Sequence, residues 1–140
     1  MEEMMKVQAV TDVGRERSVN QDYVYYSLTE TGSLPNLFLV ADGMGGHKAG
    51  DMASRYTVET FVSLVQDSTL KDPVSIINNA VTQVNRRLLQ KAAASEDYEG
   101  MGTTLVAATV YDNILRVANV GDSRLYILGN EIHRLQGIIL

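Results

Sequence analysis

The chain has no cysteine among its 140 residues, so disulfides and thiolate metal sites are excluded. It also lacks any apolar run approaching the roughly 20 residues that span a bilayer, and its N-terminus shows no charged-then-apolar signal pattern. Basic residues are too few for a nucleic-acid groove or an anionic membrane surface, since the formal net charge is −5. These absences predict a cytoplasmic protein that binds neither nucleic acid nor membranes.

What remains is an ordinary globular composition. Hydrophobic residues make up 45% of the chain and charged residues 21%, which is typical of a folded domain of this length. A chain of this size can bury a substantial core, and no repeat, low-complexity tract or linker divides it. We therefore expect residues 1–140 to form a single domain.

Strand patterns occupy the first and last thirds of the chain. Alternation of apolar and polar residues, or an excess of β-branched and aromatic ones, marks the segments 6–11, 22–28, 37–41, 103–111, 114–120, 123–128 and 131–135. Turn signals separate the later segments, at Asp112-Asn113 and at Gly129-Asn130. Several of these strands are therefore expected to pair as antiparallel neighbours.

Two amphipathic helices are predicted between the groups of strands, over about residues 51–65 and 73–94. The second has the clearer start, because Asp72 is a suitable N-cap and Pro73 suits the first turn. Its apolar residues fall on one stripe. The order of strands, two helices and more strands predicts an α+β fold, a sheet or sandwich with helices packed outside.

Asp42 is the most informative residue of the sequence. It follows the apolar segment 37–41 directly, and the glycines Gly43, Gly45 and Gly46 follow it. Glycine allows backbone oxygens and ligands to approach closely. A rigidly held carboxylate beside accessible carbonyl groups suits a hard cation such as Mg²⁺ or Mn²⁺.

Four segments, taken in order, resemble the bacterial PP2C-like (PPM) family of metal-dependent Ser/Thr protein phosphatases. They are residues 11–22, 40–47, 100–104 and 119–124. The resemblance runs from about Lys6 to Leu135 and is strongest to the members that oppose Hanks-type Ser/Thr kinases. It implies a sandwich of two antiparallel sheets flanked by helix pairs, which agrees with the α+β expectation.

The resemblance also implies a role for each candidate site residue. Asp42 would bridge two Mn²⁺ or Mg²⁺ ions, the Gly43 carbonyl would complete one coordination sphere, and Asp22 would act largely through metal-bound water. Arg17 matches the phosphate-binding arginine, and its planar fork suits a phosphate group. Asp122 matches an aspartate associated with a third, weaker metal. The implied reaction is direct attack on the phosphoester by water activated between the metals, without a covalent phosphoenzyme.

Each of these residues also has a simpler interpretation when it is considered alone. Asp22 is then a solvated residue at a strand start, Asp122 a turn residue, and Arg17 a surface charge. The segment Gly102–Thr104 is expected to shape a strand start rather than to take part in chemistry. His47 lies three residues beyond the slot of a catalytic histidine proposed for some family members, a slot that holds Met44 here, so it receives no role.

The sequence departs from the family pattern in two places. Gln21 stands where the family usually has glutamate, which removes one acceptor charge near the metals. Residues 136–140 replace the start of the family's later Asp-His-Ser, Asp-Gly and Asp-Asn segments. We therefore expect a domain truncated at its C-terminus, lacking some metal carboxylates and leaving edge strands and apolar faces uncovered.

Three functions follow as hypotheses. The first is a metal-dependent phosphatase, expected to be a monomer that acts on phosphorylated Ser/Thr proteins, including a Hanks-type kinase and its substrates. The second is a non-catalytic truncated or degenerate fragment that binds a partner or metal only. The third treats residues 43–50 as a nucleotide-phosphate loop, although their spacing fits neither the dinucleotide-binding nor the Walker pattern.

Overall fold

The computed structural model describes residues 5–17, 19–46 and 49–135. Two long helices, α1 (Ala49–Asp67) and α2 (Pro73–Ala93), and the short 3₁₀ helix η1 (Glu96–Tyr98) lie on one side of the molecule. The strands are β1 (Asp22–Ser27), β2 (Leu37–Met44), β3 (Gly102–Thr103), β4 (Leu105–Tyr111), β5 (Ile114–Val120), β6 (Leu125–Leu128) and β7 (Ile132–Leu135). The α+β class predicted from the sequence is confirmed.

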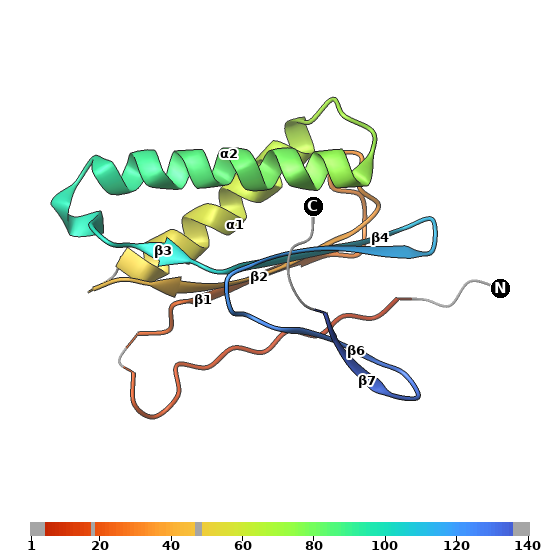
Figure 1. The fold of residues 1–140 in the computed structure, drawn as a ribbon, viewed down its shortest axis with the longest axis horizontal. Helices are drawn as coiled ribbons and strands as arrows, with labels where there is room; N and C mark the ends of the chain where they lie inside the picture. The colour runs from red at the N-terminus through yellow and green to blue at the C-terminus, as the bar shows by residue number, and fades with distance from the viewer. Residues whose placement is uncertain (1–4, 18, 47–48, 136–140) are drawn as a thin grey trace.

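The main sheet is antiparallel and has five strands, in the order β1-β2-β4-β5, with β3 paired to the end of β2. Strands β6 and β7 form a separate hairpin that extends below the sheet in Figure 1. Helices α1 and α2 cover the opposite face of the main sheet (Figure 1). The described residues therefore form one helix-covered sheet and a hairpin.

Strand β2 is the centre of this arrangement because it pairs on both sides. Its alternation is strict: Leu37, Leu39 and Ala41 are buried toward the helices, whereas Val40 is 45% exposed on the other face. The buried face joins a single core with both long helices. Its largest fully buried side chains are Phe61, Leu34, Leu37, Leu39, Ile76 and Ile77.

Helix α2 begins where the sequence predicts. The Asp72 carboxylate accepts hydrogen bonds from the Ser75 backbone N–H at 3.0 Å and from the Ser75 hydroxyl at 2.9 Å. The backbone bond from Ser75 is the main cause that lowers the pKa of Asp72 below its usual value. Helix α1 is longer than predicted at both ends. At its N-terminal end, the additional residues Ala49 and Gly50 are small and buried. Of the described helices, none is long and apolar enough to cross a membrane.

Three strand predictions need correction. Residues 6–11 form no strand, and none of the described strands pairs with them. They run instead along the face of β1 and β2 opposite the helices (Figure 1), where Val7 and Val10 border the same apolar groove as Val40. The segment 103–111 is divided at Thr104 into β3 and β4, and β2 continues past Ala41 to Met44.

Asn36 ties the beginning of β2 to the end of β4. Its Nδ2 group donates to the Val110 carbonyl at 2.9 Å, and its Oδ1 atom accepts from the Val110 N–H at 2.8 Å. The Thr109 hydroxyl donates to the Asn36 carbonyl at 2.7 Å. Since Asn36 is only 7% exposed, water is poorly placed to replace these bonds.

We therefore expect Asn36→Leu to lower the free energy of unfolding by about 2–4 kcal/mol, because unsatisfied buried polar groups cost about 1–3 kcal/mol each. Urea unfolding followed by circular dichroism measures this loss. The matched control is Thr57→Val, since the buried Thr57 hydroxyl has no hydrogen-bond partner among the described residues. Equal stability of Asn36→Leu and the control would contradict the role assigned to Asn36.

Candidate active site

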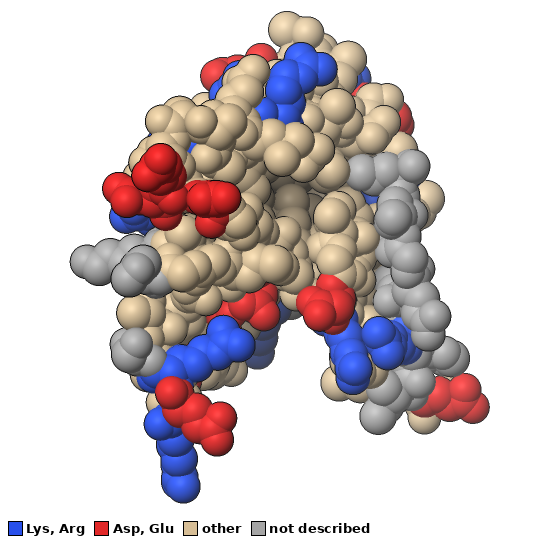
Figure 2. All heavy atoms as spheres, turned by 60° about the vertical axis from the view of Figure 1, so that its left-hand side comes forward, with Lys and Arg blue, Asp and Glu red and all other residues tan. Residues whose placement is uncertain are grey.

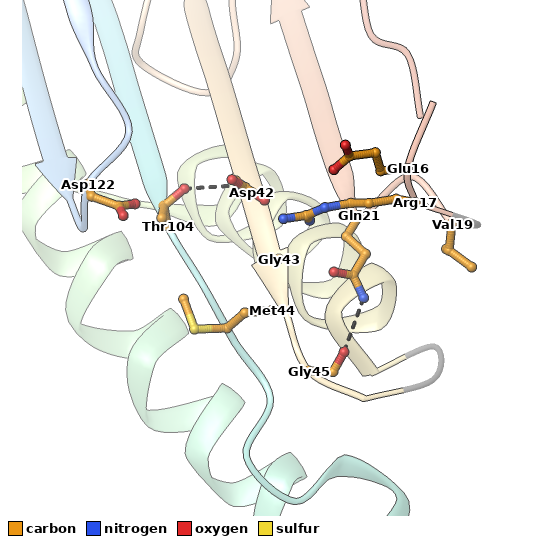
Figure 3. Close-up of a pocket in the computed structure, with 10 residues that line it drawn as sticks. All are labelled: Glu16, Arg17, Val19, Gln21, Asp42, Gly43, Met44, Gly45, Thr104 and Asp122. Atoms are coloured by element: carbon orange, nitrogen blue, oxygen red, sulfur yellow. Dashed lines mark hydrogen bonds between the residues drawn. The ribbon is translucent and has the colours of Figure 1, made fainter. Parts of the chain in front are cut away.

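An open pocket of about 580 Å³ lies where β2 runs past the loop that precedes β1. Figure 3 shows side chains from four parts of the chain around it: the loop before β1, strand β2, Thr104 between β3 and β4, and the turn after β5. On the face shown in Figure 2, the lower part of the molecule is hollowed, and both acidic and basic side chains border the hollow. The pocket is therefore a polar one built by segments distant in sequence.

Four of the five predicted site residues line this pocket: Arg17, Asp42, Gly43 and Asp122. The fifth, Asp22, is the register partner of Asp42 across the β1–β2 pair, which brings it beside the pocket. Antiparallel pairing places directly opposite side chains on the same face of the sheet, with Cβ atoms about 5 Å apart. The fold therefore brings the two predicted carboxylates together.

Asp42 lies close enough to affect the titration of Asp22. The pKa of Asp22 is raised above its ordinary value by partial burial, then by the negative charge of Asp42 and a hydrogen bond between the two carboxyl groups. The positive charge of Arg17 acts in the opposite direction. Two carboxylates that repel each other at a pocket edge are a suitable pair of ligands for a cation, because a bound cation would relieve the repulsion.

The backbone around Asp42 is held by three hydrogen bonds. The Asp42 N–H donates to the Thr104 hydroxyl at 3.1 Å, and the Thr104 N–H donates to the Asp42 carbonyl at 2.9 Å. The Gly43 N–H donates to the Gln21 carbonyl at 2.9 Å. Asp42 is thus inside a continuous strand rather than at its end.

Gly43 is required for close packing. A Cβ atom at this position would collide with the Gly50 carbonyl and would lie 3.1 Å from the Gln21 carbonyl oxygen. Helix α1 can begin directly against β2 only because Gly43 has no side chain. The glycine that the sequence analysis linked to metal binding therefore also has a packing role.

Gln21 has a function that the sequence did not reveal. Its Nε2 group donates to the Gly45 carbonyl at 3.2 Å (Figure 3), and a Cβ atom on Gly50 would lie 2.5 Å from the Gln21 side chain. A glutamate carboxylate cannot donate this hydrogen bond. The neutral amide therefore fits the loop after β2, in addition to removing a charge from the site.

Two further polar side chains of the pocket were missed. Thr104, expected only to shape a strand start, holds Asp42 and lies between Asp42 and Asp122 in Figure 3. Glu16 lines the pocket next to Arg17, and no pattern in the sequence distinguishes it from other surface acids. His47 lies outside the described residues.

The described residues match part of a divalent-metal site. Asp22, Asp42 and the Gly43 carbonyl are oxygen donors of the kind that Mg²⁺ and Mn²⁺ prefer. Within residues 5–17, 19–46 and 49–135, no group of three or more His, Cys, Asp or Glu side chains is close enough to hold an ion. The described part of the chain thus contributes a carboxylate pair rather than a complete coordination sphere.

Comparison with known proteins shows the family of this chain. The family model "Protein phosphatase 2C" matches residues 13–136. The chain belongs to the protein phosphatase 2C family. It is 35% identical over 135 residues to protein phosphatase PhpP of Streptococcus pneumoniae, and this match covers 94% of this chain and 54% of PhpP. It is 37% identical over 128 residues to the serine/threonine phosphatase stp of Listeria monocytogenes, covering 89% of this chain and 50% of stp.

Solved structures of this phosphatase 2C family have the same fold. Serine/threonine phosphatase Stp1 from Staphylococcus aureus matches with a TM-score of 0.78 at 32% identity, covering 91% of this chain and 51% of Stp1. The catalytic domain of PstP in complex with two manganese ions matches with a TM-score of 0.77 at 33% identity, covering 91% of this chain and 53% of the PstP chain. The chain therefore spans about half the length of the relatives that it matches.

The carboxylate pair predicts a pH-dependent stability. Because the pKa of Asp22 is raised in the folded chain, the folded state binds the Asp22 proton more tightly than the unfolded state does. The free energy of unfolding of the metal-free chain therefore falls as pH rises from about 4, the ordinary aspartate pKa, through the raised folded value. Asp22→Asn removes this loss.

We expect Asp22→Asn to be more stable than the wild type at about pH 7. The two proteins should be equally stable near pH 3, where the Asp22 carboxyl of the wild type is largely protonated in both the folded and the unfolded state. Urea unfolding in EDTA across this pH range measures the difference. A stability difference that is independent of pH would contradict the raised pKa of Asp22 in the folded chain.

Proposed function

We propose that this chain is part of a metal-dependent protein phosphatase that hydrolyses phosphoserine and phosphothreonine with Mn²⁺ or Mg²⁺. The observation that carries the proposal is the register of β1 and β2, which pairs Asp22 with Asp42 beside a pocket that Arg17 also lines. Membership of the phosphatase 2C family supports the same reaction class. The manganese-bound PstP structure supports the proposed cofactor.

In the proposed reaction, the positively charged Arg17 would bind the phosphate, and the negatively charged aspartates would bind the metal ions. Arg17 reaches toward Asp42 from the loop before β1 (Figure 3) and would bind the phosphate group through its planar guanidinium. Asp42, Asp22 and the Gly43 carbonyl would hold the two core ions. When bound, these ions supply a deprotonated water and neutralise phosphate charge. Asp122, on the other side of Thr104, would serve a third and weaker ion.

The relatives are about twice as long as the segment that matches this chain. We propose that the remaining ligands of the two core ions lie outside the described residues. The face of the main sheet opposite the helices, together with the β6–β7 hairpin, would belong to the two-sheet sandwich expected from the family. Phosphorylated Ser/Thr proteins, including a Hanks-type kinase and its substrates, are the proposed partners of a monomeric cytoplasmic enzyme.

A second candidate function is binding without turnover. It is favoured by one observation, namely that the described residues bring only two carboxylates together. Such a protein would retain the phosphate-facing Arg17 and the Asp22–Asp42 pair, and it would hold a metal or phosphorylated partner without hydrolysing it. Turnover and binding must therefore be measured separately.

Asp42→Asn separates the two candidates. We expect a protein that contains this chain together with the remaining metal ligands to release phosphate from a phosphothreonine peptide with Mn²⁺. Asp42→Asn should lower its kcat/KM by at least about 100-fold, since even groups that only support metal ligands contribute about 10–100-fold. Phosphate release measures turnover, and calorimetry with Mn²⁺ measures binding. Mn²⁺ binding that Asp42→Asn abolishes, without turnover by the wild type, would select the binding-only function.

Arg17 offers a second test with a matched control. Arg17→Ala should lower kcat/KM for the same peptide by roughly 10–100-fold, because a hydrogen bond to a charged group is worth about 1.5–3 kcal/mol. Arg15→Ala is the control, since Arg15 is exposed in the same loop but does not line the pocket. Equal losses in the two variants would show that the loop's charge, rather than the Arg17 fork, determines phosphate binding.

A further inference from the structure

Thr104 holds both backbone groups of Asp42. Its hydroxyl accepts the Asp42 N–H at 3.1 Å, and its own N–H donates to the Asp42 carbonyl at 2.9 Å. Thr104 is 3% exposed and lies in the break between β3 and β4. Thr104 therefore takes the place of regular strand pairing beside Asp42, the candidate metal ligand.

The turn that carries Asp122 rests on the same threonine. The hydroxyl oxygens of Thr104 and Ser123 lie 2.6 Å apart. Gly121 packs so closely that a Cβ atom there would lie 2.8 Å from the Thr104 methyl carbon, and its φ of +100° also favours glycine. The Asn119 side chain closes the turn by donating to the Ser123 carbonyl at 3.0 Å.

A hydroxyl group is suited to this position because it can accept one hydrogen bond and donate another. The Thr104 oxygen accepts from Asp42, and its own proton remains available for Ser123. Valine has nearly the same shape but can do neither. The hydrogen-bonded path Asp42–Thr104–Ser123 thus joins two candidate metal-binding aspartates, Asp42 and Asp122, that lie 80 positions apart in the sequence.

We propose that Thr104 and Ser123 are positioning residues, which fix the Asp42 backbone against the Asp122 turn and thereby set the geometry for cation binding at Asp42. The proposal rests on the metal-dependent function proposed above. It assigns a positioning role to Thr104, which the sequence analysis expected only to shape a strand start. Neither residue contacts the substrate or the reacting atoms in this role.

The test compares four single variants and one double variant with the wild-type chain. Thr104→Val removes the hydroxyl, Thr104→Ser retains it, and Ser123→Ala removes its partner. Thr57→Val is the matched control, because it deletes another buried threonine hydroxyl that has no partner among the described residues. Circular dichroism and urea unfolding first establish that each variant is folded under the conditions used.

Two readouts follow. Amide hydrogen exchange of Asp42 in the metal-free chain should be faster in Thr104→Val and, to a smaller extent, in Ser123→Ala. The Mn²⁺ dissociation constant, measured by calorimetry, should rise roughly 10–100-fold in Thr104→Val, as for other groups that orient metal ligands. Thr104→Ser should restore both values, and Thr57→Val should change neither. The combined Thr104→Val and Ser123→Ala variant should lose less than the sum of the single losses, because both act on one hydrogen bond.

Unchanged exchange at Asp42 in Thr104→Val would overturn the proposal, as would a Thr104→Ser variant that is as impaired as Thr104→Val. A loss of stability without any change in Mn²⁺ affinity would also overturn it, since that is the result expected of a purely structural threonine. If the wild-type chain bound no Mn²⁺, the metal-dependent function would fail in this chain. The positioning of Asp42 for a cation would then be rejected with it, even if exchange showed that Thr104 holds the backbone.

Discussion

Strand β1 pairs with β2 so that Asp22 lies directly opposite Asp42. A slip of this register by one residue would turn the side chains of β1 to the other face of the sheet. Tyr23 and Tyr25 would then leave the helix-covered core that they now border, and Asp22 would point away from Asp42. The same pairing that completes the core therefore also assembles the carboxylate pair, so the site is as well determined as the fold.

Close backbone packing around β2 is the second condition. Gly43 allows helix α1 to begin against the strand, and Gly50 leaves room for the Gln21 side chain, whose amide holds the Gly45 carbonyl. On the opposite side, Gly121 allows the Asp122 turn to rest on Thr104. These glycines thus allow three segments to pack near Asp42: the start of α1, the loop that carries Gln21, and the Asp122 turn.

The site also shows a conflict between stability and function. Partial burial and the neighbouring Asp42 carboxylate raise the pKa of Asp22, so the metal-free fold is expected to be less stable at neutral pH than at low pH. The polar network of Thr104, Ser123 and Asn119 lies around Asp42, and the buried Asn119 Oδ1 atom has no hydrogen-bond partner among the described residues. Such local costs are common where a protein keeps charged groups in position for a ligand.

The sequence by itself determined the class of most main elements, and it predicted the chemical type of the site. Most of the predicted strand segments became strands, the Asp72 cap and the apolar stripe became α2, and Asp42 among glycines predicted an oxygen-rich cation site. Only the tertiary structure decided that residues 6–11 form no strand, that Gln21 donates to Gly45, and that Thr104 holds Asp42 from 62 positions away. The physical reason is one of range. Alternation and capping depend on neighbours along the chain, whereas strand register and hydrogen bonds between distant segments depend on which partner the completed sheet places alongside.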